Sequence, residues 1–117
     1  MITLKNKVHA ALDGLCEDVI YGTPADFSAR ERVVWRESLN RRHAQADGRE
    51  YLAELNYTLD FFARSAEAAA TLFAAADERM TGAGFRRESA AEIYDGEGAR
   101  ISARYRSLCD EKGNMYQ

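Results

Sequence analysis

The residues that could support catalysis or bind a metal are scattered along this chain of 117 residues. Its histidines and cysteines stand at spacings that match no metal-ligand pattern: His9, His43, Cys16 and Cys109. No Ser or Cys lies with a histidine in a nucleophile motif, and a G-x-S-x-G sequence is absent. The sequence therefore predicts no catalytic residues, no metal, no cofactor and no enzymatic activity.

Two further groupings have plain structural interpretations. Gly96-Glu97-Gly98 predicts a turn rather than a phosphate-binding loop, because no helix follows to offer its N-terminus. Glu88 and Glu92 are predicted to share a strand face with arginines. Surface ion pairing is the ordinary role of such carboxylates, far more often than acid–base catalysis.

One group of side chains resembles a binding surface and is predicted to span a hairpin: Arg86, Arg100, Arg104 and Arg106. One interpretation is a salt-bridged outer face, balanced by Glu88 and Glu92. The other is a docking patch for an acidic partner or for nucleic acid. The net charge of −3 and the isoelectric point of about 5.4 argue against nucleic acid as the main partner, since proteins that bind duplexes are usually basic.

Composition favours one folded domain over residues 1–117. Hydrophobic residues make up 46% and charged residues 30%, which is typical of neither a disordered nor a membrane protein. No apolar run approaches the ~20 residues of a spanning helix, and Met1–Val8 is polar, so we expect no membrane span and no signal peptide. The two cysteines are expected to be reduced and packed as small apolar residues in a cytosolic protein.

The remaining elements must pack around Glu50–Arg64, where apolar and polar residues alternate. Because strand side chains alternate between faces, this pattern predicts a strand with one buried and one solvated face. The predicted inward residues are Tyr51, Ala53, Leu55, Tyr57, Leu59, Phe61 and Ala63. At ~3.3 Å per residue the strand spans about 50 Å, longer than a small core needs.

The preceding strand begins at Arg32–Leu39 and continues to Asp47-Gly48, a strong turn signal. A two-residue turn there would place Arg36 opposite Leu59 on the apolar face. We therefore expect a three-residue loop, Ala46-Asp47-Gly48, because a one-residue slip exchanges the two faces. The expected pairs are Val33 with Phe61, Trp35 with Leu59, and Leu39 with Leu55.

The distal half of this hairpin, Asn40–Glu50, is almost wholly polar. It has little to bury, and we expect it to project from the body of the domain. One interpretation is a solvated tip without further role. The other is an arm that becomes ordered on a neighbouring subunit, because unpaired strand edges accept partners.

Helices are predicted from Thr3, as the cap, to a stop at Gly14, and over Ala66–Thr81 with Ser65 as the cap. A short strand is predicted at Asp18–Tyr21. The strands Gly84–Tyr94 and Ala99–Cys109 should form a hairpin with odd positions inward, and the tail Asp110–Gln117 is expected to be loose. The pairs expected in that hairpin are Ile93 with Ile101, Ala91 with Ala103, and Phe85 with Cys109. These elements predict an α+β two-layer sandwich, with a mainly antiparallel sheet of two hairpins packed by two helices.

Several segments, in their order and spacing, carry a family resemblance: Val19-Ile20-Tyr21-Gly22, Val33-Val34-Trp35-Arg36, Tyr57–Ala63 running into an alanine-rich helix, Gly84-Phe85-Arg86-Arg87, Tyr94-Asp95 and Arg104-Tyr105-Arg106. In these the chain resembles the tail-completion or tail-terminator proteins of long-tailed bacteriophages, which include minor capsid and tail-to-head joining proteins.

The resemblance implies a non-enzymatic virion protein of the tail or neck, assembled in the host cytoplasm. Such proteins form a ring, usually a hexamer, that caps the tail tube and joins it to the head connector. Expected partners are copies of the chain, the tube protein and the connector, with no membrane and no sequence-specific nucleic acid, although DNA passes through the ring. We infer an oligomer interface at Arg41, Arg42, His43, Asp47, Arg49, Glu50, Met115 and Tyr116. The alternatives are a head-side connector or stopper, and a small nucleic-acid-binding α+β module that would use the four arginines.

Overall fold

The computed structural model describes residues 2–23, 31–46, 49–94 and 98–116. The elements follow in the order α1 (Lys5–Leu12), β1 (Asp18–Tyr21), β2 (Arg32–Ala46), β3 (Arg49–Ala63), α2 (Ala66–Gly82), β4 (Arg86–Tyr94), β5 (Ala99–Asp110) and β6 (Met115–Tyr116). Within the described residues the strands form one six-stranded sheet in the order β1-β2-β3-β5-β4, with β6 paired to β5. β1 runs parallel to β2 and the other pairs are antiparallel. The predicted α+β class is confirmed, with a mixed sheet and two helices.

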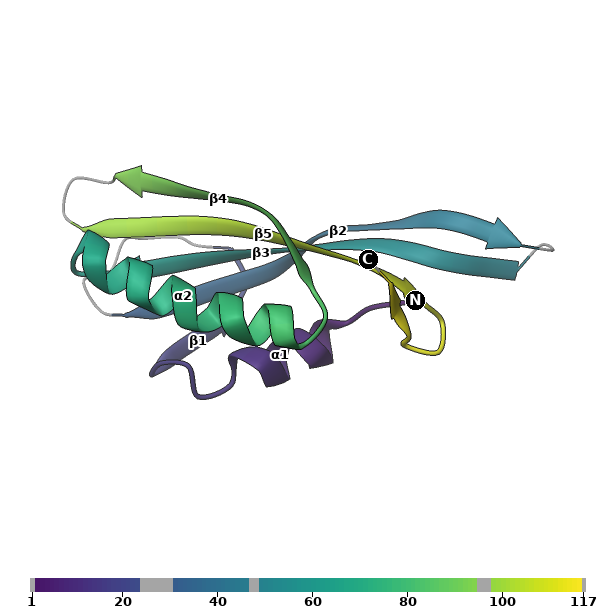
Figure 1. The fold of residues 1–117 in the computed structure, drawn as a ribbon, viewed down its shortest axis with the longest axis horizontal. Helices are drawn as coiled ribbons and strands as arrows, with labels where there is room; N and C mark the ends of the chain where they lie inside the picture. Colours follow the sequence, from purple (N-terminus) through teal and green to yellow (C-terminus); the bar gives the residue numbers. More distant parts are fainter. Residues whose placement is uncertain (1, 24–30, 47–48, 95–97, 117) are drawn as a thin grey trace.

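The molecule is elongated, with extents of 53 × 22 × 19 Å. Both helices lie on the same side of the sheet, and the distal end of the β2–β3 hairpin extends beyond them (Figure 1). The end of the hairpin that we expect to project is thus the part of the sheet that lies beyond the helices.

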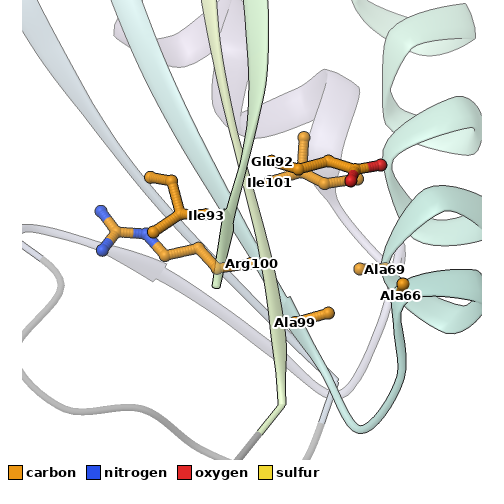
Figure 2. Close-up of a pocket in the computed structure, with 7 residues that line it drawn as sticks. All are labelled: Ala66, Ala69, Glu92, Ile93, Ala99, Arg100 and Ile101. Atoms are coloured by element: carbon orange, nitrogen blue, oxygen red, sulfur yellow. The ribbon is translucent and has the colours of Figure 1, made fainter. Parts of the chain in front are cut away.

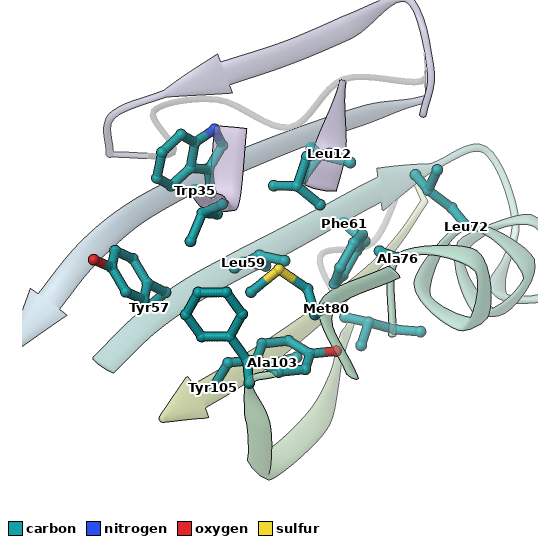
Figure 3. Packing of buried hydrophobic residues seen from close by; sticks show 14 of the residues in the cluster. Leu12, Trp35, Tyr57, Leu59, Phe61, Leu72, Ala76, Met80, Ala103 and Tyr105 are labelled. Atoms are coloured by element: carbon teal, nitrogen blue, oxygen red, sulfur yellow. The ribbon is translucent and has the colours of Figure 1, made fainter. Parts of the chain in front are cut away.

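β3 occupies the middle of the sheet because it pairs with β2 along one edge and with β5 along the other. Its odd-numbered side chains from Ala53 to Ala63 are buried and form one cluster with apolar residues of both helices. Figure 3 shows Leu59 and Phe61 of β3 packed between Leu12 of α1 and Met80 of α2. The odd positions are buried as the sequence predicts, but the prediction of a solvated opposite face is wrong. The even positions of β3 from Glu54 to Phe62 are buried as well.

The two helices begin differently. The hydroxyl of Ser65 accepts a hydrogen bond from the backbone N–H of Ala68 at 3.1 Å, so α2 has the predicted cap. The cap predicted for α1 is wrong: the helix begins after Leu4 with no side-chain cap. The hydroxyl of Thr3 instead donates to Glu37 of β2 at 2.7 Å, which ties the N-terminal segment to the sheet.

The predicted register of the long hairpin holds near its base and fails toward its tip. Val33 pairs with Phe61 and Trp35 with Leu59, as expected, but Leu39 pairs with Asn56 instead of Leu55. A bulge between Glu37 and Leu39 inserts the extra residue within β2. Ala46 consequently pairs with Arg49, so two residues rather than three connect the strands. Asp47 and Gly48 themselves lie outside the described residues.

The predicted register of the second hairpin is wrong. Ile93 pairs with Arg100 and Ala91 with Ser102, so the odd positions of β4 from Ser89 onward face away from the helices. A bulge between Arg87 and Ser89 shifts the strand. Burial does not oppose the shift, because β4 is an edge strand of mostly small or charged residues that remain exposed. The third expected pair also fails, since Phe85 lies before β4 and Cys109 pairs with Met115.

No helix in the described part of the chain combines the length and the apolar character needed to cross a membrane.

Tyr57 of β3 anchors the N-terminal segment. Its hydroxyl accepts from the backbone N–H of Leu4 at 2.9 Å and donates to a carboxylate oxygen of Glu37 at 2.8 Å. The side chain is fully buried, and this burial raises the pKa of the hydroxyl, so the neutral donor is the stable form.

We expect Tyr57→Phe to lower the free energy of unfolding by about 1–3 kcal/mol, because the Leu4 N–H loses its buried acceptor. Urea unfolding monitored by circular dichroism measures the change. Tyr21→Phe is the matched control: this half-exposed hydroxyl accepts only a 3.4 Å bond from the N–H of Glu37, and its loss should change stability by less than about 0.5 kcal/mol. Equal effects of the two variants would show that the anchor contributes nothing of its own.

Candidate interaction surfaces

The four arginines of the predicted docking patch lie on the sheet face away from the helices. Arg100, Arg104 and Arg106 alternate along β5 with residues buried in the core, and Arg86 of β4 pairs directly with Arg106. We call this surface the open face. The structure therefore brings the four predicted residues together, and their positive charges lie on neighbouring strands.

A buried carboxylate in the centre of the open face holds two arginines. Asp60 of β3 has a side-chain exposure of 0%. Arg36 of β2 donates to one of its oxygens at 3.1 Å, and Arg100 donates through Nε and Nη2 to the other at 3.1 and 3.0 Å. Asp60 therefore joins the two strands that flank β3.

Arg100, together with Arg32, also shields an aromatic ring on the open face. The guanidinium carbons of Arg32 and Arg100 lie 5.1 and 5.4 Å from the centre of the Phe62 ring, within the range of cation–π attraction. Phe62 is only 2% exposed although no helix in the described residues covers this face. Arginine side chains thus form part of the cover that helices supply on the opposite face.

A second carboxylate on β3 repeats the arrangement toward the hairpin. Arg106 of β5 donates through Nε to Glu54 at 2.9 Å, and Arg41 of β2 donates to the other oxygen through Nε at 2.8 Å and Nη2 at 2.7 Å. The hydrogen bond from Arg106, followed by that from Arg41, holds the pKa of Glu54 below its ordinary value. Arg41, an expected interface residue, is therefore engaged within its own subunit.

The balancing carboxylates are not the predicted ones. Glu92 pairs with the buried Ile101 and lies on the helix-facing side, so it does not share the open face with the arginines. The acidic residues that do so are Asp60 and Glu54, which the sequence analysis assigns only to the solvated face of β3. Arg100 and Arg106 reach these two carboxylates because β3 pairs with β5. The two strands are far apart in the sequence, so no local pattern predicts that pairing.

Arg86 and Arg104 differ from the other two arginines of the patch. Both are exposed, and within the described residues no ion pair joins either of them to a carboxylate. They are the part of the patch most available to a partner.

The hairpin tip is only partly described. Arg42 and His43 are exposed. Asp47 lies outside the described residues, and of Arg49 and Glu50 only the backbone, within β3, is described. β1 pairs with Arg32–Trp35 alone, so the remainder of the outer edge of β2 faces no strand in the described part of the chain.

The C-terminal segment has more order than the sequence predicts. Met115 and Tyr116 pair with Cys109 and Leu108 to form β6. The carboxylate of Asp110 organises the intervening turn, where it accepts from the backbone N–H groups of Lys112 and Asn114 at 2.9 Å. Met115 and Tyr116, both expected interface residues, therefore lie at a sheet edge. Met115 is partly buried and Tyr116 is 48% exposed.

The hollows in the described surface are small or open and carry no catalytic grouping. One of about 10 Å³, beside the start of α2, is lined by Ala66, Ala69 and Ile101 among others and has room for a single water molecule (Figure 2). A groove of about 300 Å³ runs between α2 and β4, lined by residues such as Phe73 and Ala90. Among the described residues, no group of three or more His, Cys, Asp or Glu side chains could hold a metal ion.

Comparisons with known proteins add no family. No protein-family model matches the chain, and no curated protein sequence is significantly similar to it.

We expect Asp60→Asn to lower the free energy of unfolding by about 1–3 kcal/mol, because two partly exposed arginines lose their shared buried carboxylate. Chemical denaturation measures the loss. Glu111→Gln, an exposed change in the turn before β6, is the control and should stay within about 0.5 kcal/mol of the parent. An unchanged stability of the Asp60 variant would mean that the arginines need no anion there.

The lowered pKa of Glu54 predicts a pH dependence. A depressed carboxyl pKa stabilises the fold above the ordinary value of about 4.3, and this contribution is lost as the pH falls through the folded pKa. The Glu54→Gln variant should therefore lose less stability than the parent between about pH 6 and about pH 3, as measured by urea midpoints. Glu88→Gln, which alters an exposed residue of β4, should retain the parental slope. Identical slopes for the Glu54 variant and the parent would refute the linkage.

Proposed function

We propose that the chain is a structural subunit of a bacteriophage tail, of the tail-terminator or tail-completion type. In this proposal, a two-layer sandwich of helices on sheet forms the body of each subunit. Copies of the subunit assemble into a hexameric ring. The ring ends growth of the tail tube and offers a surface to the head connector. The protein then belongs to the tail or neck of the virion, and catalysis is not part of its role.

The observation that carries the proposal is the β2–β3 hairpin. It continues beyond both helices and exposes polar residues such as Arg42 and His43 (Figure 1). The outer edge of β2 lacks a strand partner there among the described residues. An extension of this kind adds little to the core of one subunit, whereas a ring requires each subunit to present contacts to two neighbours.

The open face supports a protein contact better than a nucleic-acid interface. Arg36 and Arg100 are engaged by Asp60, and Arg41 and Arg106 are engaged by Glu54. These carboxylates offset much of the positive charge that would attract phosphates. The overall charge of −3 acts in the same direction.

The proposal is tested by shortening the hairpin, at the cost of one pair outside it, that of Leu52 with Asp110 of β5. Replacing residues 43–52 with Asn-Gly leaves Arg42 and Ala53, which already pair, on either side of a two-residue turn. The ion pairs of Glu54 are kept. We expect a folded protein that no longer forms rings and no longer limits tube length, because the arm is lost while the core remains.

Circular dichroism reports folding, sedimentation reports assembly, and electron microscopy reports the lengths of tubes grown from the major tail protein of the same phage. A control variant keeps the hairpin and changes Thr71, an exposed residue of α2, to Ser. Outright unfolding of the shortened chain would show that the tip belongs to the core. Normal rings and normal tube lengths would equally contradict the proposal, while rings that bind a head connector without limiting tube length would favour a head-side stopper.

A further inference from the structure

Few large apolar side chains are exposed on the described surface, and two of them are neighbours on β1. Ile20 is 45% exposed and Tyr21 is 48% exposed. Because adjacent strand residues point to opposite faces, Ile20 lies on the open face beside Val34, and Tyr21 lies on the helix-facing side beside Trp35. The edge of β1 therefore presents one bulky side chain on each face of the sheet.

The backbone of β1 is also available at this edge. Gly22 donates its N–H to the carbonyl of Trp35 at 2.9 Å, and successive residues of a strand direct their backbone groups to opposite sides. The polar backbone groups of Tyr21 and Val19 are therefore directed away from β2. In the described part of the chain no strand pairs with them.

The opposite edge of the sheet has the complementary form. Among the described strands β4 pairs with β5 alone, and at its middle Ala90 and Ala91 are both exposed. Ala90 borders the groove of about 300 Å³ between β4 and α2, with Phe73 and Ile101 in its lining. Small side chains at this edge leave room for large ones to be added.

The registers place the two edges at the same height. Two rows of paired residues cross the whole sheet from β1 to β4. The first consists of Ile20, Val34, Asp60, Ser102 and Ala91, and the second consists of Tyr21, Trp35, Leu59, Ala103 and Ala90. The bulky pair on β1 and the alanine pair on β4 thus end the same two rows, and each bulky residue faces the same side as its alanine counterpart.

We propose that β1 of one copy pairs with β4 of the next, so that the exposed side of Tyr21, whose ring packs edge-on against Trp35 of its own copy, meets the groove beside Ala90, and Ile20 covers Ala91. This inference rests on the ring of the proposed function and specifies its interface. A closed ring permits no net rise from one copy to the next, so rows that end at equal height meet when the strands lie along the ring axis. β1 and β4 run in opposite directions within a copy, so the new pair is antiparallel.

A second copy is the occupant that fits both edges. Each copy supplies the bulky residues at one edge and the small residues at the other, which is the requirement of a head-to-tail contact. The two faces also continue without reversal, because the helix-facing side of one sheet joins the helix-facing side of the next. A contact of one edge with itself would instead place Ile20 against Ile20 and leave the groove empty.

Disulfide trapping tests the contact directly. The variant carries Ile20→Cys and Ala91→Cys in a chain whose own thiols are removed by Cys16→Ser and Cys109→Ala. Mild oxidation is expected to give a ladder of covalent oligomers on a non-reducing denaturing gel that ends at the ring size, because each copy links to both neighbours. Each single-cysteine variant, and the pair Ile20→Cys with Thr71→Cys, should give no ladder, since Thr71 lies on the exposed side of α2.

A companion variant does not depend on cysteine chemistry. Ala90→Lys places a charge at the edge of the groove on an already exposed residue, so the subunit should fold normally by circular dichroism while sedimentation shows loss of the ring. Thr71→Lys is the matched control and should keep the ring.

Covalent dimers without higher oligomers, rings without cross-links, or a protein that stays monomeric at every concentration would each overturn the β1–β4 contact. The proposed function fails separately. If the ladder forms but tail tubes grow unchanged, the contact stands and the terminator role does not. If tubes are capped but the cysteines never link, the role stands and this interface is wrong.

Discussion

The pairing of β3 on both edges is the constraint on which the remainder of the structure depends. Its odd residues must be covered by apolar groups, which α1 and α2 supply. Its even residues include Asp60 and Glu54, which become buried on a face that neither α1 nor α2 covers. A buried carboxylate is tolerated only when hydrogen-bonded and charge-paired, so the flanking strands must bring arginines. The odd residues of β3 therefore require the two helices on one face of the sheet, and its even residues require the arginines on the other.

This constraint changes the interpretation of the arginine cluster. A row of guanidinium groups on a sheet suggests attraction for an anion outside the protein, but Arg36, Arg100, Arg41 and Arg106 are bound to carboxylates of the same subunit. Their planar groups also shield apolar surface, as over Phe62. Cross-strand ion pairing thus serves the stability of an extended sheet, and the edges and the hairpin remain as the features suited to assembly.

The edges have an unusual asymmetry. Edge strands are commonly protected by charge or by small, twisted segments, because open backbone groups invite other chains. β4 carries charges and alanines, whereas β1 leaves Ile20 and Tyr21 half exposed. The β1 edge therefore carries large exposed side chains, and the β4 edge carries small ones. A long hairpin and two unlike edges on one small subunit suit head-to-tail assembly. In such an assembly each contact joins two different surfaces, so no surface needs to match itself.

The sequence alone determined the order of the elements from α1 to β5, the burial of the odd residues of β3, the cap of α2 and the pairing at the hairpin base, because each follows from local periodicity or a local side-chain bond. It did not predict β6 or the burial of the even residues of β3. It identified the four arginines but not their partners. Only the tertiary structure decided that β3 pairs with β5, that bulges at Ser38 and Glu88 shift the registers, and that Asp60 and Glu54 lie under arginines. A bulge costs little where edge residues stay exposed, and pairing between distant strands leaves no periodic trace, so neither could be predicted from neighbouring residues.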